Sequence, residues 1–482
     1  MLGNDLHLEL GAGGGRRAAL ITALREAVRA GRLAPGTRLP PYRSLAADLG
    51  IARNTVADAY AELVAEGWLT ARQGSGTRVA DRVAAPAPGP VRRAAPPALP
   101  YDLVQGRPDP AAFPRGPWLA SARRALTDAP HEAFGARDPH GRIELRRALA
   151  EYLARVRGVR AAPDRIVVCS GAAHGLRLLA RVLGGGRPWG VEAYGLPFHR
   201  DLLADAGIRT VPVPVDEDGA RTGDIPPGAG AVLLTPAHQF PTGGPLHPGR
   251  RADVLEWARR SGGLVVEDDY DGELRYDRRP VGAVQGLDPE RTVFLGSVSK
   301  SLSPALRLGW MCLPAALVDA VVDAKGAREP YASATEQLTL ADFLGRGAYD
   351  RHVRGMRRRH RERRDRLSAV LAERVPEVRV TGIAAGLHAV LELPPGTERA
   401  VLAAAARHGV ATEGLAAYRH PDARDHARPD GLVIGYATPP ERLYGAALDA
   451  LCGALSEGLA AGGLRQPGPR VARAAPPPSG SP

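Results

Sequence analysis

The sequence is poor in lysine: only two of its 64 basic residues (lysine plus arginine) are lysines, Lys300 and Lys325. Such a bias is typical of a GC-rich genome, and arginine takes over most surface and ion-pair roles of lysine. A guanidinium cannot act as a neutral amine, however, so only lysine can form a Schiff base with an aldehyde. Lys300, at the end of Gly296-Ser297-Val298-Ser299-Lys300, is therefore a candidate for a residue retained for its amine. The alternative is that a lysine survived the arginine bias by chance. Lys325 lies in no motif that argues against this alternative.

Cysteine is also scarce, and long apolar runs are absent. The three cysteines, Cys169, Cys312 and Cys452, lack the paired spacing of disulfide frameworks and zinc sites, and the 13 histidines form no HExxH pattern. We therefore expect reduced thiols and no metal. No run of about eighteen apolar residues is present, and no basic segment leads into an apolar one at the N-terminus. These absences predict a cytoplasmic protein without a membrane span.

The length and composition predict several units. A chain of 482 residues exceeds one ordinary domain. Residues 81–100 are rich in proline and alanine and predict a semi-extended linker, and residues 463–482 predict a disordered tail. We thus expect a small unit at 1–80 and a large one at 101–462. The net charge of +12 does not by itself indicate DNA binding, because residues 1–80 carry an excess of only +3.

The small unit has the pattern of a DNA reader. A first helix is expected before Gly31, a second at about 44–49, and a third that opens at Arg53-Asn54-Thr55. Two helices joined by a glycine-containing turn form a helix-turn-helix, whose second helix begins at the major groove. Arg53 and Asn54 suit base edges, and Thr55 suits phosphate or base. Residues 70–79 predict a hairpin with a glycine-rich tip, a wing that can approach the DNA backbone or minor groove.

The string from Gly31 to Val79, GRLAPGTRLPPYRSLAADLGIARNTVADAYAELVAEGWLTARQGSGTRV, resembles the winged helix-turn-helix of GntR-type bacterial repressors over nearly its whole length. The resemblance implies double-stranded DNA as a partner. One departure is Pro41-Tyr42, which stands where a serine or alanine pair is more usual, and we expect it to alter how the second helix meets phosphates. The resemblance places these residues at DNA-contacting positions: Arg43, Arg53, Asn54, Thr55, Gln73 and Gly74.

In the large unit, strand-like and helical patterns alternate. Strands are predicted at 165–169, 231–235, 263–267 and 292–295, with a helix at 173–183. This alternation predicts a mostly parallel sheet with helices on both faces. Ligands of such sheets bind at the carboxyl ends of the strands.

Three motifs of the large unit suit pyridoxal 5'-phosphate, which needs a lysine, a carboxylate at its ring nitrogen, a donor at its phenolic oxygen and a phosphate cradle. Asp268 and Tyr270 end an apolar strand and point the same way on an extended chain, so one can hold the ring nitrogen and the other the phenolic oxygen. An acidic cluster at a strand end is also compatible with a magnesium site or a solvated turn, although no P-loop precedes it. Lys300 follows thirty residues later.

The phosphate cradle has candidates on both sides of that strand. Gly171 and Ala172 lie between a predicted strand and helix, where N–H groups can face a phosphate, although plain connections have the same pattern. Two hydroxyls beside the lysine, Ser297 and Ser299, and the guanidinium of Arg307 supply further contacts.

The strings CSGAAHGLRLLARVL, TPAHQFPTGGPL, VEDDYDGELRYD and GSVSKSLSPALRLGW resemble fold-type I aminotransferases, and with the N-terminal unit the chain is similar to the MocR subfamily of GntR regulators. The resemblance implies a winged helix-turn-helix plus a fold-type I, PLP-dependent aminotransferase-like domain: an α/β domain with a mostly parallel sheet, flanking helices and a smaller C-terminal α/β part. It implies that Lys300 forms the internal aldimine, that Asp268 pairs with the ring nitrogen, and that Tyr270 meets the phenolic oxygen. Ser297 and Arg307 are implied to bind phosphate. A head-to-tail homodimer with two reader domains for paired half-sites is also implied.

The chain departs from aminotransferases around the cofactor. Phe240 stands where Asn-Pro-Thr-Gly has its asparagine, which removes a donor to the phenolic oxygen. Leu196 stands where an aromatic residue usually stacks on the ring, so that either Tyr194 or Phe198 substitutes or the stacking is weaker. A tyrosine that often reaches the partner subunit's phosphate is replaced by Phe134.

Two further segments bear on substrate binding and on surface charge. Residues 431–436 are apolar where aminotransferases have a late arginine for the substrate carboxylate. Arg354–Arg366 carries eight arginines and two acids, which favours a solvated helix face over a second DNA site.

We interpret the chain as a cytoplasmic transcription regulator that senses PLP, or an amine or amino acid held as its aldimine, with vestigial or partial aminotransferase chemistry. One alternative is an active aminotransferase with an accessory DNA-binding module. The other is a large unit that only dimerises the reader and binds no cofactor.

Overall fold

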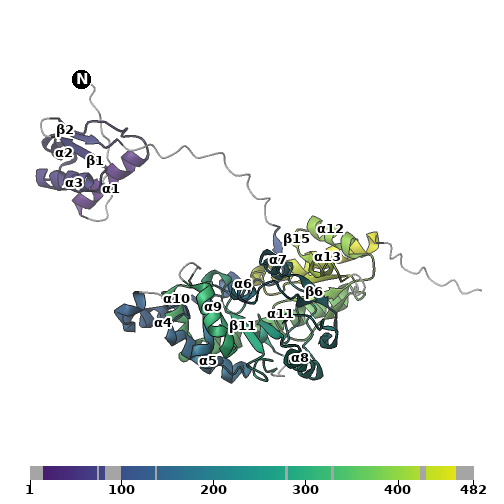
Figure 1. Cartoon of the computed structure of the whole chain (residues 1–482). Helices are drawn as coiled ribbons and strands as arrows, with labels where there is room; N and C mark the ends of the chain where they lie inside the picture. The colour runs from purple at the N-terminus through teal and green to yellow at the C-terminus, as the bar shows by residue number, and fades with distance from the viewer. Residues whose placement is uncertain are drawn as a thin grey trace, which may run out of the picture. The chain divides into compact units, whose positions relative to one another are not determined.

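The computed structural model describes residues 15–72, 75–81, 99–135, 138–276, 281–326, 331–423 and 430–462 (Figure 1). The chain forms two compact units, Met1–Pro97 and Ala98–Pro482. Residues 82–98 of the predicted linker and the whole predicted tail at 463–482 lie outside the described residues.

The N-terminal unit is a three-helix bundle with a hairpin. Its elements are α1 (Arg16–Arg29), α2 (Tyr42–Leu49), α3 (Arg53–Ala65), β1 (Leu69–Arg72) and β2 (Gly76–Val79). The hairpin is antiparallel, and its core side chains Leu69 and Val79 lie opposite each other. Gly50 ends α2 at φ 62°, a left-handed conformation that glycine adopts without steric cost. The predicted order of helix, turn, helix and hairpin is confirmed.

The second helix begins two residues earlier than the sequence predicts. Pro41 occupies its N-cap position, with extended backbone at ψ 149°. The Tyr42 ring packs edge-on against the buried ring of Tyr60 at a centroid distance of 5.4 Å, and the Tyr60 hydroxyl donates to the Pro40 carbonyl. Tyr42 of the Pro41-Tyr42 departure thus packs the start of α2 against α3.

A seven-stranded sheet forms the centre of the large unit, with the strand order β4-β12-β11-β10-β9-β5-β6. The strand pairs are parallel except those of β12, which runs antiparallel to both neighbours. This confirms the prediction of a mostly parallel sheet. The strands are β4 (Ile166–Cys169), β5 (Trp189–Glu192), β6 (Thr210–Val213), β9 (Ala231–Leu234), β10 (Leu264–Asp269), β11 (Thr292–Ser297) and β12 (Gly309–Cys312).

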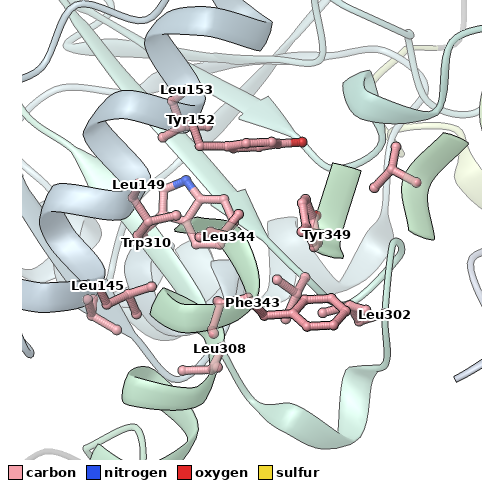
Figure 2. Packing of buried hydrophobic residues seen from close by; sticks show 14 of the residues in the cluster. Leu145, Leu149, Tyr152, Leu153, Leu302, Leu308, Trp310, Phe343, Leu344 and Tyr349 are labelled. Carbon is pink, nitrogen blue, oxygen red and sulfur yellow. The ribbon is translucent and has the colours of Figure 1, made fainter. Parts of the chain in front are cut away.

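Helices cover both faces of this sheet, so alternate residues of a strand enter different cores. On β12, Trp310 belongs to a cluster with α5, α10 and α11, whereas Met311 belongs to one with α6, α7 and α9. Figure 2 shows part of the first cluster, where Leu149 and Leu153 of α5 and Phe343 of α10 gather with Trp310. The helices are α4 (Arg115–Asp128), α5 (Ile143–Arg157), α6 (Ala172–Leu183), α7 (Pro197–Asp205), α8 (Pro248–Ser261), α9 (Val318–Lys325), α10 (Ala334–Gly345) and α11 (Ala348–Arg374).

A smaller C-terminal part has its own antiparallel sheet, in the order β13-β14-β17-β16, and its own core with α12 and α13. The pairing of β3 with β15 ties the start of the unit to this part. A short hairpin of β7 and β8 completes the strands. The bounds are β3 (Tyr101–Asp102), β7 (Val215–Asp216), β8 (Gly219–Ala220), β13 (Arg379–Thr381), β14 (Ala389–Glu392), β15 (Val410–Ala411), β16 (Glu413–Gly414), β17 (Gly431–Ile434), α12 (Glu398–Arg407) and α13 (Glu441–Ala461).

The arginine run on α11 is only partly a solvated face. Arg354, Arg358 and Arg361 are exposed, as predicted. The prediction is wrong for others, because the buried Arg363 donates to two backbone carbonyls and to Glu441, and Arg359 pairs with the buried Asp109. All three cysteines are buried and unpaired, and within the described ranges no helix is long and apolar enough to cross a membrane.

Candidate cofactor site and nucleic-acid interface

Lys300 lies in the loop that follows β11, at the carboxyl edge of the central sheet. Its Nζ donates to the Gly106 carbonyl at 2.5 Å. Gly106 has φ +76°, and a Cβ there would lie 2.9 Å from Nζ, so glycine permits this close approach. Burial lowers the pKa of the Lys300 amine, although Asp268 and Asp271 act in the opposite direction. A lowered pKa favours the neutral amine, which is the form that reacts with an aldehyde.

The other lysine has a structural role. Lys325 is 1% exposed at the end of α9, and its Nζ donates to the Pro139 and Val168 carbonyls, each at 2.6 Å. It also lies 4.9 Å from the ring centroid of Tyr331. A compact ammonium with three donors fits between two carbonyls, whereas a planar guanidinium needs more room. Lys325 is thus not a chance survivor of the arginine bias.

Asp268 and Tyr270 line the same cavity. Asp269, between them, instead forms a buried ion pair with Arg157 at 2.7 Å. Asp268 is 5% exposed, and burial, reinforced by Asp269, raises its pKa to about 7. Its Oδ1 is buried without a hydrogen-bond partner among the described residues. Such an oxygen requires a donor, and a protonated ring nitrogen is one.

His199 of α7 also lies near this carboxylate, and the sequence motifs did not single it out. Its Nε2 lies 3.9 Å from Asp268 Oδ2, and burial lowers its pKa to about 4. The available signal was its spacing, because Leu196 and His199 are one helical turn apart and both line the cavity. The two aromatic residues considered as ring-stacking substitutes do not line it, since Tyr194 is buried in a neighbouring cluster and Phe198 is 50% exposed.

Arg307 and the start of α6 form a candidate anion site. An Arg307 Nη donates to the Ser170 carbonyl at 2.6 Å, and a Cβ at Gly171 would lie 3.3 Å from that nitrogen. Gly171 is the N-cap of α6 at φ 100°, and the N–H groups of Ala172 and Ala173, in the first turn, precede the first N–H that bonds back to the Gly171 carbonyl, that of His174. A helix N-terminus beside a guanidinium favours a phosphate. Ser297 and Ser299 are partly buried on the loop to Lys300, where Ser297 Oγ accepts from the Ser299 N–H at 3.4 Å.

Apolar residues lie at Phe240, where aminotransferases have an asparagine, and within the segment 431–436, which offers no arginine for a substrate carboxylate. Phe240 is 4% exposed, and its ring is edge-on to Tyr270 and Tyr418 at centroid distances of 5.9 and 5.2 Å. Val433 of β17 belongs to the same cluster and is fully buried. Neither side chain can hold a phenolate or a carboxylate by hydrogen bonds.

The Tyr270 hydroxyl has a partner that the sequence did not indicate. It lies 3.0 Å from His238 Nδ1, which in turn lies 2.8 Å from Asp271 Oδ2. Burial, followed by the charges of Asp271 and Asp268, raises the pKa of Tyr270, so the hydroxyl keeps its proton. No spacing rule connects His238 to Asp271, because the two lie on different loops.

In the N-terminal unit, the residues expected to contact DNA lie at the start of α3 and on α2. Arg43, Arg53 and Asn54 are exposed, and Thr55 is partly buried. Gln73 and Gly74, expected in the wing, lie outside the described residues.

Comparison with known proteins accounts for both units. The family described as "Bacterial regulatory proteins, gntR family" matches residues 17–79, and "Aminotransferase class I and II" matches residues 113–422. The chain is 33% identical over 427 residues to the "HTH-type pyridoxine biosynthesis transcriptional regulator PdxR" of Corynebacterium glutamicum, covering 88% of this chain and 92% of that one. It is 34% identical over 446 residues to the "Probable rhizopine catabolism regulatory protein MocR" of Rhizobium meliloti, covering 87% and 89%.

Solved structures show the same fold for the large unit. The alpha-aminoadipate aminotransferase LysN of Thermus thermophilus matches with a TM-score of 0.66 and 25% identity over 75% of this chain and 93% of that one. A Pyrococcus horikoshii kynurenine aminotransferase matches with a TM-score of 0.67 and 24% identity over 74% and 91%. The chain belongs to the MocR-type regulators of the gntR family, which join a helix-turn-helix domain to an aminotransferase class I and II domain.

Proposed function

We propose that this protein is a cytoplasmic, DNA-binding transcription regulator whose large unit binds pyridoxal 5'-phosphate at Lys300. The observation that carries the proposal is the unpartnered, buried Oδ1 of Asp268 in a cavity shared with Tyr270. Lys300 is close enough for the Asp268 charge to affect its pKa. A carboxylate, a phenol and an amine are the three groups that the ring, the phenolic oxygen and the aldehyde of this cofactor need.

Each residue then has one task. Lys300 supplies the amine that tethers the cofactor, Asp268 accepts a hydrogen bond from the protonated ring nitrogen, and Tyr270 donates one to the phenolic oxygen. The phosphate is held by Arg307 and the start of α6, with Ser297 and Ser299 nearby. When bound, the cofactor supplies an aldehyde that an amino compound can occupy in place of Lys300.

The regulatory signal is the cofactor itself or an amine or amino acid bound to it. A ligand shifts a protein between states only when it binds those states unequally. We infer that exchange at Lys300 favours one arrangement of the large unit, and that this changes how the reader domains engage an operator.

We further propose a head-to-tail homodimer that reads paired half-sites. Leu119 and Leu126 of α4 are 63% and 41% exposed and lie seven residues apart, on one face of the helix. Phe134 is 52% exposed. Large exposed apolar side chains mark an interaction surface, and a two-fold dimer matches a palindromic operator.

Purified protein incubated with pyridoxal phosphate tests the cofactor assignment. We expect a visible absorption band that is lost in Lys300→Ala, and operator affinity that differs with and without cofactor. Lys325→Arg serves as the matched lysine control and should keep the band. A colourless wild-type protein would overturn the assignment and favour a large unit that only dimerises the reader.

A second candidate function is an aminotransferase with an accessory DNA-binding module. Asp268 and Tyr270 in one cavity, with Lys300 close enough for the Asp268 charge to affect its pKa, support it, whereas Phe240 and Leu196 count against a firmly held ring. A panel of amino acids, assayed for ketoacid formation, separates the two functions. Sustained multiple turnover would favour the enzyme. No more than one turnover per site would favour the regulator.

A further inference from the structure

Two buried side chains, His238 and Asp271, and the partly buried Tyr270 form a hydrogen-bonded network behind the proposed cofactor. Tyr270 Oη lies 3.0 Å from His238 Nδ1, and the same nitrogen lies 2.8 Å from Asp271 Oδ2. The side chains of His238 and Asp271 are each 1% exposed. One nitrogen therefore faces two oxygens in a region shielded from solvent.

The position of one proton follows from this geometry. A ring nitrogen carries at most one proton, and an ionised carboxylate only accepts hydrogen bonds. If Nδ1 had no proton, its lone pair would face a lone pair of Asp271 at 2.8 Å, which is repulsive. The proton therefore sits on Nδ1, which can donate but not accept. Tyr270 cannot donate its proton to His238 and is left to donate it elsewhere.

The surroundings hold this arrangement in place. A Cβ at Gly386, which has φ +72°, would collide with Asp271 Oδ2 and lie 2.7 Å from His238 Cε1, so glycine is required. The His388 ring lies 5.2 Å from the His238 ring, and its Nε2 lies 3.1 Å from the Pro241 carbonyl. Other charged and titratable groups surround these three hydrogen-bonded side chains. They are Asp268, Glu192, Lys300, His388, Tyr276 and Tyr436.

We propose that His238 and Asp271 are positioning residues that orient the Tyr270 hydroxyl as a donor toward the cofactor's phenolic oxygen. This rests on the proposed function, because it assigns a role toward the cofactor. Aminotransferases have a second donor to that oxygen at the position of Phe240, which here packs edge-on against Tyr270. The hydrogen bonds among Asp271, His238 and Tyr270 compensate for the loss of that second donor. Asp271 acts through His238, and His238 acts through Tyr270.

The spectrum of the cofactor-loaded protein tests this order of action. A donor to the phenolic oxygen weakens the hydrogen bond between that oxygen and the proton on the Lys300 nitrogen. Loss of the donor therefore raises the pH at which the Lys300 nitrogen loses this proton. In Asp271→Asn we expect the midpoint of the visible pH titration to rise by about one to two pH units, and Tyr270→Phe should raise it similarly. The double variant should rise no further than Tyr270→Phe alone, because the remaining effect of Asp271, its negative charge near the Lys300 nitrogen, lowers the midpoint when it is removed.

Asp253→Asn on α8 removes an exposed carboxylate and should leave the midpoint unchanged. A folded Asp271→Asn protein with the wild-type midpoint would overturn the proposal, and so would shifts that add in the double variant. A merely structural Asp271 would alter stability without moving the midpoint.

Nitrogen-15 NMR of histidine-labelled, cofactor-free protein provides a readout that needs no cofactor. We expect His238, assigned by its loss in His238→Phe, to carry its proton on Nδ1 in the wild type and to lose this preference in Asp271→Asn. A wild-type His238 protonated only on Nε2 would overturn the inference. A protein with the expected tautomer but no visible band would instead overturn the cofactor assignment alone.

Discussion

Replacing Asp268 by asparagine tests the role proposed for the buried carboxylate. The amide keeps the shape of the side chain but cannot carry the charge that a protonated ring nitrogen needs. A hydrogen bond to a charged partner is worth about 1.5 to 3 kcal/mol, which corresponds to about 10- to 100-fold in affinity. We therefore expect the affinity for pyridoxal phosphate, measured by titration of the visible band, to fall by that factor in Asp268→Asn.

The same substitution has an opposite effect on the cofactor-free protein. Burial raises the pKa of Asp268 from an ordinary 3.8 to about 7, so the folded state binds this proton more tightly than the unfolded state. Stability is therefore lost as pH rises from about 4 to 7, by on the order of 4 kcal/mol from this group. Urea denaturation of the cofactor-free protein at pH 5 and pH 8 should capture about 2.6 kcal/mol of this loss, because pH 5 already lies above the unfolded pKa, and the difference should be smaller in Asp268→Asn.

Asp253→Asn is the matched control, because it removes an exposed carboxylate of the same unit and should change neither quantity. Unchanged cofactor affinity in a folded Asp268→Asn protein would refute the ring-nitrogen assignment. An unchanged dependence of stability on pH would refute the argument from burial. The two measurements are independent, so each can fail alone.

Three further substitutions test other parts of the molecule. Lys325→Met leaves the Pro139 and Val168 carbonyls without their donor and should lower the free energy of unfolding of the large unit by about 2 kcal/mol in urea denaturation, and a loss below about 0.5 kcal/mol would contradict this. Arg307→Lys replaces a fork by a point charge and should weaken pyridoxal phosphate binding about tenfold; equal affinity would argue against a phosphate contact. Arg53→Ala should weaken operator binding about 10- to 100-fold in gel-shift titrations, with a smaller effect on non-operator DNA; unchanged affinity and specificity would refute its place at a base edge.

Local patterns in the sequence predicted most of the elements of the fold and part of the site. The glycine that ends α2 and the alternation of side chains along β10 are local features, set by residues close together in the sequence. They were sufficient to predict the helix-turn-helix and to predict that Asp268 and Tyr270 point the same way. The start of α2 was missed because its first turn depends on contact between Tyr42 and Tyr60, eighteen residues apart. His238 and Asp271 were present in quoted motifs, but their contact is set by packing of two loops, which no periodicity encodes.

Amino-acid composition predicted the roles of individual residues less well than their contacts in the structure explain them. Lysine scarcity singled out Lys300 but could not distinguish it from Lys325, whose two carbonyl partners lie on segments more than 150 residues away in the chain. Charge density on α11 predicted solvent exposure, yet Arg363 is buried because its partners are carbonyls that follow β17 and Glu441 at the start of α13.

The distribution of polar groups around the cavity supports a sensor over an enzyme. Asp268, Tyr270, Lys300 and Arg307 are the groups that we propose to hold a cofactor, and the His238–Asp271 pair contacts one of them, Tyr270. Phe240 and Val433 instead lie in an apolar cluster, so that neither offers a hydrogen bond to a phenolic oxygen or a charge to a carboxylate. Turnover requires that substrate and cofactor both be held through each step, whereas sensing requires only that one ligand bind two states unequally. A site that retains the cofactor's partners while its substrate wall is apolar meets the second requirement, and this is why we expect ligand exchange at Lys300 to register in DNA binding rather than in product.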